Sequence, residues 1–300
     1  MIYTLGETVL DIIFEDGHVV ASTPGGAMLN TAITLGRLGC QVSHISEVSD
    51  DLCGNLILNF LRENNVNTDF MTVHKTGKTT IAMAFLDEKK NAEYNFYRSD
   101  EPIIIRYPLS SPMPDFAEGD LLLFGSFYSL DEENRRKLLE IIAKAKENKT
   151  LILYDPNIRK AHCPLSMAEK ERFFENILFS DIVRGSDEDF KNVLDTESMT
   201  AIYNMVQQQG CRHLFLTKGA GGAFYKCGEI ELHVPAKSLQ PISSIGAGDT
   251  FNAGILYGIS LGNRLPIHAE EIMKIAVEMA SEVCMSKGNY IKMNNNSCYQ

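Results

Sequence analysis

Short apolar runs alternate with longer amphipathic segments along this chain, and that alternation limits the folds that are open to it. The runs of strand length are 2–5, 42–45, 121–124, 151–154, 181–183 and 213–217. The segments of helical length lie near 27–38, 51–64, 131–147, 165–178, 198–209, 249–261 and 267–286. Strands that alternate with helices are typical of a mostly parallel sheet with helices on both faces. The sequence therefore predicts an α/β fold in three layers.

Residues 8–22 and 79–98 depart from this alternation of strands and helices. Each has apolar residues on both sides of a polar turn, which is typical of a β-hairpin. We expect the two segments to form a small β-sheet beside the main sheet, a lid over a site. Two extra edge strands on the main sheet are the alternative. No internal repeat or linker interrupts the 300 residues, so we expect residues 1–300 to form a single domain that includes this lid.

Composition excludes several classes of function. The net charge of −11 disfavours a nucleic-acid partner, because phosphate backbones select basic faces. The chain shows no signal peptide and no apolar run of the roughly 18 residues that span a membrane. Seven scattered cysteines without a CxxC pair indicate reduced thiols and a cytosolic location. HExxH and zinc-like spacings are absent, so we expect no metal site built by the protein alone.

The strongest local signal is the segment 243–254, with the sequence SSIGAGDTFNAG. Three tiny residues, Gly246, Ala247 and Gly248, precede a segment of helical length. The free N–H groups and the dipole at such a helix start suit a phosphoryl group. Asp249 would share that site and can take the proton from an attacking hydroxyl. Ordinary N-capping of the helix by Asp249 is the alternative.

Two weaker signals lie elsewhere in the chain. Gly26 and Asn30 are four residues apart, so on a helix they share one face and can meet one ligand. Asp155, Asn157 and Arg159 alternate, so in an extended segment they share one face, where the arginine can bind phosphate oxygens. A glycine turn with a surface asparagine, and a surface turn with a charge pair, are the respective alternatives.

In this order, residues 25–39 (GGAMLNTAITLGRLG) and 243–254 resemble the ribokinase-like sugar kinases, also called the PfkB family. The resemblance runs from Gly6 to about Gly288. It implies the ribokinase-like three-layer α/β/α fold with a β lid. It also implies transfer of a phosphoryl group from ATP to a sugar hydroxyl, with Mg²⁺ held largely through water and phosphates.

The resemblance also implies roles for individual residues. Asp249 matches the catalytic base, and residues 246–248 match the anion hole. The sugar side comprises Asp11, Gly25, Gly26, Asn30, Phe96, Arg98 and Arg159. The nucleotide side comprises Asn157, Ser186, Thr217, Lys218, Gly219 and Gly222. Asp155 and Asp189 are expected to reach the magnesium ion only through water.

The resemblance defines the compound that accepts the phosphoryl group less closely than it defines the phosphoryl transfer itself. Residues 96–98 (FYR) and 124–126 (FGS) resemble fructokinases, which implies that fructose is converted to fructose 6-phosphate. A Tyr-Arg pair also occurs in kinases of 2-keto-3-deoxygluconate, so that sugar acid, ribose and nucleosides are alternative acceptors. A non-catalytic sugar or nucleotide sensor on the same fold is an alternative of a different class, since a fold alone does not fix a function.

Three positions depart from the family pattern. Residues 186–189 (SDED) replace an NxxE element. Ser243 stands where many members have an aspartate that helps to bind a monovalent cation, which leaves potassium dependence open. Val277 stands where an asparagine is common beside the adenine. The oligomeric state is open too: lid sheets can pair in a homodimer, and edge strands can also be protected by charge.

Overall fold

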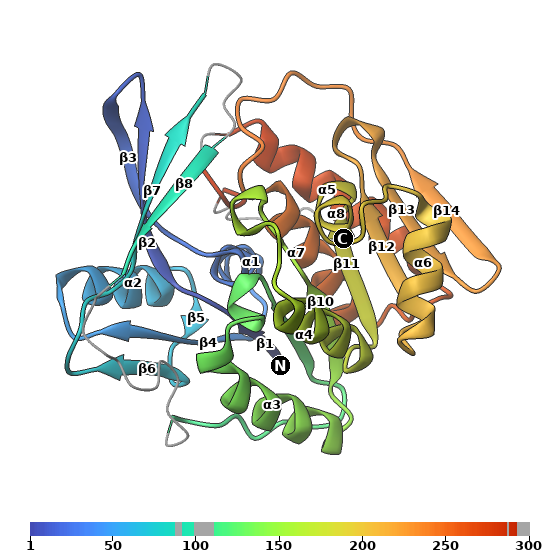
Figure 1. The fold of residues 1–300 in the computed structure, drawn as a ribbon, viewed down its shortest axis with the longest axis horizontal. Helices are drawn as coiled ribbons and strands as arrows, with labels where there is room; N and C mark the ends of the chain where they lie inside the picture. The colour runs from blue at the N-terminus through green and yellow to red at the C-terminus, as the bar shows by residue number, and fades with distance from the viewer. Residues whose placement is uncertain (88–91, 99–110, 287, 293–300) are drawn as a thin grey trace.

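A ten-stranded sheet forms the middle layer of the protein (Figure 1). The computed structural model describes residues 1–87, 92–98, 111–286 and 288–292. The sheet order is β14 (Ile230–Val234), β13 (Ala223–Cys227), β12 (His213–Thr217), β11 (Ile182–Ser186), β10 (Leu151–Asp155), β9 (Leu121–Gly125), β1 (Ile2–Leu5), β4 (Val42–Ser49) and β5 (Val66–Asn67), and β6 (Met71–His74) also pairs with β4. All pairings are parallel except those of the β12–β13–β14 edge.

Helices cover both faces of this sheet and divide the core in two. One core takes apolar residues from α1 (Ala27–Arg37), α2 (Leu52–Glu63), α7 (Ala247–Ser260) and α8 (Ala269–Cys284). The other takes them from α3 (Glu132–Glu147), α4 (Met167–Leu178), α5 (Asp187–Leu194) and α6 (Met199–Gln208). Along β9, Leu121 and Leu123 join the first core and Leu122 and Phe124 the second, because successive strand residues point to opposite faces. The predicted three-layer fold is confirmed.

The two irregular segments pair with each other in a second, four-stranded sheet. Its order is β3 (His18–Gly25), β2 (Val9–Glu15), β7 (Ile81–Leu86) and β8 (Ala92–Tyr97). In Figure 1 these strands project to one side of the main sheet. Within the described residues none of the four pairs with the main sheet, so the alternative of extra edge strands is wrong. We call this unit the small sheet.

Several elements differ from the sequence expectation. Helix α5 and the β13–β14 hairpin were not predicted, because α5 has only eight residues and the hairpin carries many exposed side chains. Strand β11 runs on to Ser186 and places Arg184 inside the sheet. Helix α7 begins at Ala247 rather than Asp249. Within the described residues, every helix falls short of the length or hydrophobicity that a bilayer crossing requires.

Helices α7 and α8 pack closely because α7 carries glycines on the face that meets α8. A β-carbon at Gly254 would lie 2.4 Å from the backbone Cα of Ala276. A β-carbon at Gly258, one turn later, would lie 3.2 Å from the side-chain Cγ1 of Ile272. The first neighbour is backbone and cannot move aside, whereas the second is a side-chain atom that can.

Substitution Gly254→Ala should lower the free energy of unfolding by about 1–3 kcal/mol, the usual cost of overpacking. Gly258→Ala is the matched control. It should stay within about 1 kcal/mol of the wild type, because improved helix propensity offsets a small adjustment of Ile272. Urea unfolding of both variants measures the difference, and equal stabilities would contradict the close approach of α7 to Ala276.

Candidate active site

Asp249 lies at the third position of α7 and is almost fully buried, with 4% of its surface exposed. Asn30 of α1 donates a hydrogen bond from Nδ2 to its Oδ2 atom at 2.8 Å, and Thr31 Oγ1 donates to its backbone oxygen at 2.9 Å. The Oδ1 atom of Asn30 is buried and has no partner among the described residues. An unpaired buried amide oxygen is costly until a ligand or water donates to it. Helix α1 thus orients the carboxylate and offers an acceptor beside it.

The start of α7 is built to leave backbone N–H groups available. Gly246 is the N-cap residue in the left-handed region (φ 78°), and within the described chain no side chain caps the helix. The Asp249 side chain bonds with Asn30 instead, so the alternative of N-capping by Asp249 is wrong. Because first-turn N–H groups lack intrahelical acceptors, those of Gly248 and Asp249 can face an anion.

A buried arginine lies directly against this helix start. A β-carbon at Gly248 would come within 3.0 Å of both terminal nitrogens of Arg184. Arg184 donates to Asp155 Oδ2 at 3.0 Å and to Thr217 Oγ1 at 2.9 Å. Asn252, one turn along α7 from Gly248, donates to the same Asp155 oxygen at 2.6 Å. The helix dipole and the guanidinium therefore place positive potential at one point.

The root of the small sheet supplies the facing wall. Asp11 of β2 lies against Gly25 so closely that a β-carbon there would be 2.0 Å from Asp11 Oδ2. Gly26 has φ 120°, and a β-carbon on it would meet the Glu7 carbonyl oxygen at 2.2 Å. Both glycines are therefore needed for the close approach of the Asp11 carboxylate and the Glu7 carbonyl. They bring Asp11 and the start of α1 to the same crevice.

Burial raises the pKa values of both acids in this crevice. The pKa of Asp249 rises to about 6, mainly because of burial, while the Asn30 hydrogen bond and Arg159 oppose the rise. The pKa of Asp11 rises to about 7 through burial and the negative charge of Asp249. An acid with a pKa near 6 is ionised at pH 7 and still basic enough to accept a proton.

The segment after β10 is not extended as expected. Strand β10 ends at Asp155, and Asn157 adopts a left-handed conformation (φ 42°). The backbone turns because Asp155 Oδ1 accepts the Asn157 N–H at 3.2 Å and Asp189 Oδ1 accepts the Ile158 N–H at 2.7 Å. Asp155 is buried at the end of β10, whereas Arg159 is exposed and its charge lowers the pKa of Asp249.

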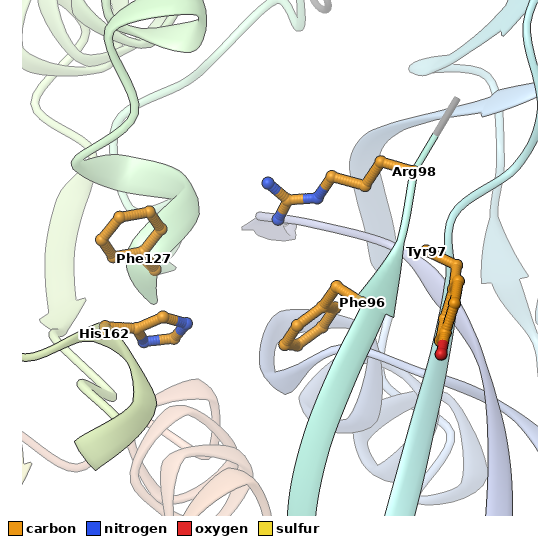
Figure 2. A pocket seen from close by; sticks show the side chains of 5 residues that line it. All are labelled: Phe96, Tyr97, Arg98, Phe127 and His162. Carbon is orange, nitrogen blue, oxygen red and sulfur yellow. The ribbon is translucent and has the colours of Figure 1, made fainter. Parts of the chain in front are cut away.

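A pocket of about 480 Å³ opens between the small sheet and the main body. Figure 2 shows Phe96 and Arg98 on one side, facing the stacked pair of Phe127 and His162 on the other. Phe96 is 40% exposed. Arg98 NH2 lies 2.8 Å from Glu7 Oε1 at the end of β1. Both Arg98 and Arg159 lower the pKa of His162, so charges from the small sheet and from the segment after β10 act on this pocket.

The predicted nucleotide residues follow β11 and β12. Thr217 is linked to the crevice through Arg184. The Ser186 hydroxyl and the Asp189 carboxylate form a capping box at the start of α5, so the hydroxyl already has a structural role. Lys218 Nζ donates to the Glu197 carbonyl at 3.2 Å. Gly219 and Gly222 are both in positive-φ conformations around the 3₁₀ turn Gly219–Gly221.

The acids that were expected to reach a metal through water are already engaged. Asp155 bonds with Arg184, Asn252 and the Asn157 N–H. Asp189 accepts the N–H groups of Ile158 and Ser186. Among the described residues, no three His, Cys, Asp or Glu side chains gather as a metal site. This donor set fits a magnesium ion that keeps its waters and phosphate oxygens as ligands.

The C-terminal segment closes the back of the site. The hydroxyl of Tyr290 lies 2.5 Å from Thr23 Oγ1 and donates to the Pro24 oxygen at 3.2 Å. A β-carbon at Gly246 would lie 2.1 Å from the backbone oxygen of Asn289. Residues 289 and 290 therefore touch both the root of the small sheet and the helix start.

Sequence reasoning missed several of these residues. Arg184 follows the predicted strand 181–183, but it was not among the predicted site residues, although a charge directly after a buried apolar run indicates a functional role. Asn252 lies three residues after Asp249 in an apolar helix, so its place on the same face was readable. Tyr94 lies near both crevice acids, and burial and Asp11 raise its pKa to about 12. No local pattern marked His162 or Tyr290.

Known carbohydrate kinases are similar to this chain in sequence and in fold. The model of the pfkB family of carbohydrate kinases matches residues 2–296. A fructokinase of Rhizobium leguminosarum bv. trifolii is 31% identical over 274 residues, which cover 88% of this chain and 81% of that protein. A fructokinase of Vibrio alginolyticus is 25% identical, covering 86% of this chain and 84% of that protein. The chain therefore belongs to the pfkB family of carbohydrate kinases.

Solved structures show the same fold. A crystal structure of a Vibrio cholerae fructokinase variant, with fructose, ADP and potassium bound, has a TM-score of 0.86 at 22% identity and covers 96% of this chain and 93% of that one. The aminoimidazole riboside kinase of Salmonella enterica, bound to aminoimidazole riboside and an ATP analogue, has a TM-score of 0.82 at 22% identity, covering 96% and 94%.

Substitution Asp11→Asn should stabilise the protein more at pH 8 than at pH 5. The folded pKa of about 7 lies above the ordinary value of 3.8. The wild type therefore loses stability as the pH rises from about 4 through 7, and the amide variant lacks that loss. We expect the difference in the free energy of unfolding between the variant and the wild type to change by more than about 1 kcal/mol between pH 5 and pH 8. Urea unfolding measures it, with Asp16→Asn in an exposed turn as control, and a pH-independent difference would contradict the burial of a charged Asp11.

Proposed function

We propose that this protein transfers the γ-phosphoryl group of ATP to a hydroxyl of fructose and yields fructose 6-phosphate and ADP. The observation that carries the proposal is the buried Asp249, which Asn30 orients at the start of a helix that no described side chain caps. An ionisable base and an anion site at one point are what phosphoryl transfer to an alcohol requires. The fructokinases among the curated relatives support fructose as the acceptor.

In this mechanism the sugar hydroxyl loses its proton to Asp249 while its oxygen attacks the γ-phosphorus. The bond between that phosphorus and the β–γ bridging oxygen breaks, and ADP takes the electron pair. The Gly248 and Asp249 N–H groups, with Arg184 behind them, stabilise the charge on the transferred group. Asp11, Asn30 and the backbone at Gly25 and Gly26 hold the other hydroxyls.

The cofactors belong to the same proposal. Residues 217–222 and Asn157 would face the nucleotide. A magnesium ion held by phosphate oxygens and water, near Asp155 and Asp189, would neutralise phosphate charge. Ser243 stands where the family resemblance implies an aspartate that helps to bind a monovalent cation. Its Oγ atom accepts the Ile245 N–H at 3.1 Å.

We further propose that the chain acts as one kinase domain in which the small sheet is the lid. Support comes from Phe96 and Arg98, which reach from β8 toward the main body across the pocket (Figure 2). We also predict a cytosolic location, and a homodimer that forms through the small sheets. Size-exclusion chromatography with light scattering measures whether the protein is a homodimer.

The test of the substrate is ADP release with ATP and Mg²⁺ across fructose, ribose, 2-keto-3-deoxygluconate, adenosine, inosine and glucose. We expect the highest kcat/KM with fructose. A preference for another compound would retain the kinase chemistry and replace the acceptor. Folded protein that binds ATP and turns over none of them would contradict the proposal and favour the sensor alternative.

Substitution Asp249→Asn should lower kcat by about 10²–10⁴-fold while the protein still folds and binds sugar, because it removes a general base. In the wild type, kcat/KM should fall below pH 6, because the pKa of Asp249 is about 6 and only the ionised form accepts a proton. The residual activity of the variant should lack that pH limb. Steady-state kinetics from pH 5 to 8 measure both, and near-normal turnover by the variant would rule out the assigned role.

A further inference from the structure

The guanidinium of Arg98 forms an ion pair with a carboxylate of the main body. Its NH2 atom lies 2.8 Å from Glu7 Oε1, and the side chains are 34% and 21% exposed respectively. The bond is charge-assisted, but it lies in an exposed position where water and salt weaken it. The pair joins the residue that follows β8 of the small sheet to the residue that follows Gly6 at the end of β1. Arg98 also lies over the Phe96 ring at 5.6 Å, which fixes its direction across the pocket.

The other groups at this end of the crevice leave little excess positive charge. Arg159 is close enough to lower the pKa values of Asp249 and Asp11, so its charge opposes two carboxylates. The pKa of His162 is lowered to about 4 by burial and by Arg159 and Arg98, so the imidazole is neutral at pH 7. Glu7 itself acts on Asp11 and raises its pKa. Among the described residues, the sugar side is balanced or negative.

We propose that Glu7 sets the acceptor class of this kinase: by holding Arg98 it makes the site select uncharged sugars and reject sugar acids. This inference rests on the proposed sugar kinase function and names its substrate class. Glu7 does not touch the reacting atoms in this scheme. It is a positioning residue that decides what Arg98 is free to bind.

The physical reason lies in what an acidic acceptor would meet. A sugar carboxylate that approached Arg98 would have to displace Glu7, because the guanidinium already donates to that carboxylate. A displaced Glu7 would also lose its charged partner. A neutral sugar meets no such penalty, because its hydroxyls can accept from the remaining N–H groups of Arg98 while the pair stays intact.

Two substitutions separate this role from a structural one. Glu7→Gln keeps an oxygen that can accept from Arg98 but removes the charge. Glu93→Gln removes the same charge from an exposed position on β8 and serves as the matched control. Both are compared with the wild type for kcat/KM on D-fructose and on 2-keto-3-deoxygluconate, at saturating ATP and pH 7.5. The same comparison is repeated in an Arg98→Ala background.

We expect Glu7→Gln to shift the ratio of kcat/KM, fructose over sugar acid, by about two- to fivefold toward the acid, the scale of one exposed ion pair. Glu93→Gln should leave the ratio at the wild-type value, and in the Arg98→Ala background Glu7→Gln should have no further effect. An unchanged ratio in Glu7→Gln, with or without a fall in stability, would overturn the proposal. So would an equal shift in both glutamine variants. Wild-type protein that phosphorylates neither sugar would instead refute the proposed function, and that result is distinct from an unchanged ratio.

Discussion

The buried ion pair between Asp155 and Arg184 is the interaction on which the site depends. It joins β10 to β11, reaches β12 through Thr217, and reaches α7 through Asn252. Removing either partner would leave a buried charge without compensation, which usually costs more than the pair contributes. The same guanidinium lies against Gly248, so the pair that joins the strands also contacts the start of α7.

Much of the architecture was readable from the sequence because parallel strands and their covering helices leave strong apolar periodicities. All six predicted strands of the main sheet and all seven predicted helices exist, with ends shifted by a few residues. The small sheet followed from two turn-centred segments. The eight-residue α5 and the exposed β13–β14 hairpin could not be predicted, because a short helix and an exposed edge bury too few residues to leave a pattern.

The residues of the candidate site also divide into those that the sequence predicts and those that only the folded chain reveals. Asp249, Asn30, Gly25 and Gly26 lie in local motifs whose spacing carries the chemistry, and the structure brings them together. Partners from distant segments could not be predicted, because the pairing of Arg98 with Glu7 or of Arg184 with Asp155 is a property of the folded chain. The expected extended run at 155–159 was wrong because two carboxylates capture its N–H groups, which alternation alone does not reveal.

The contact of Tyr290 with Thr23 and Pro24 joins positions 267 and 266 residues apart. During synthesis, a chain that emerges from its N-terminus cannot form this contact until residue 290 has left the ribosome. Part of the main sheet can pair much earlier, since β1, β4, β9 and β10 all precede residue 156, and its last strand, β14, ends at Val234. The crevice is therefore completed last, and a nascent chain can be largely folded while it still lacks a finished site.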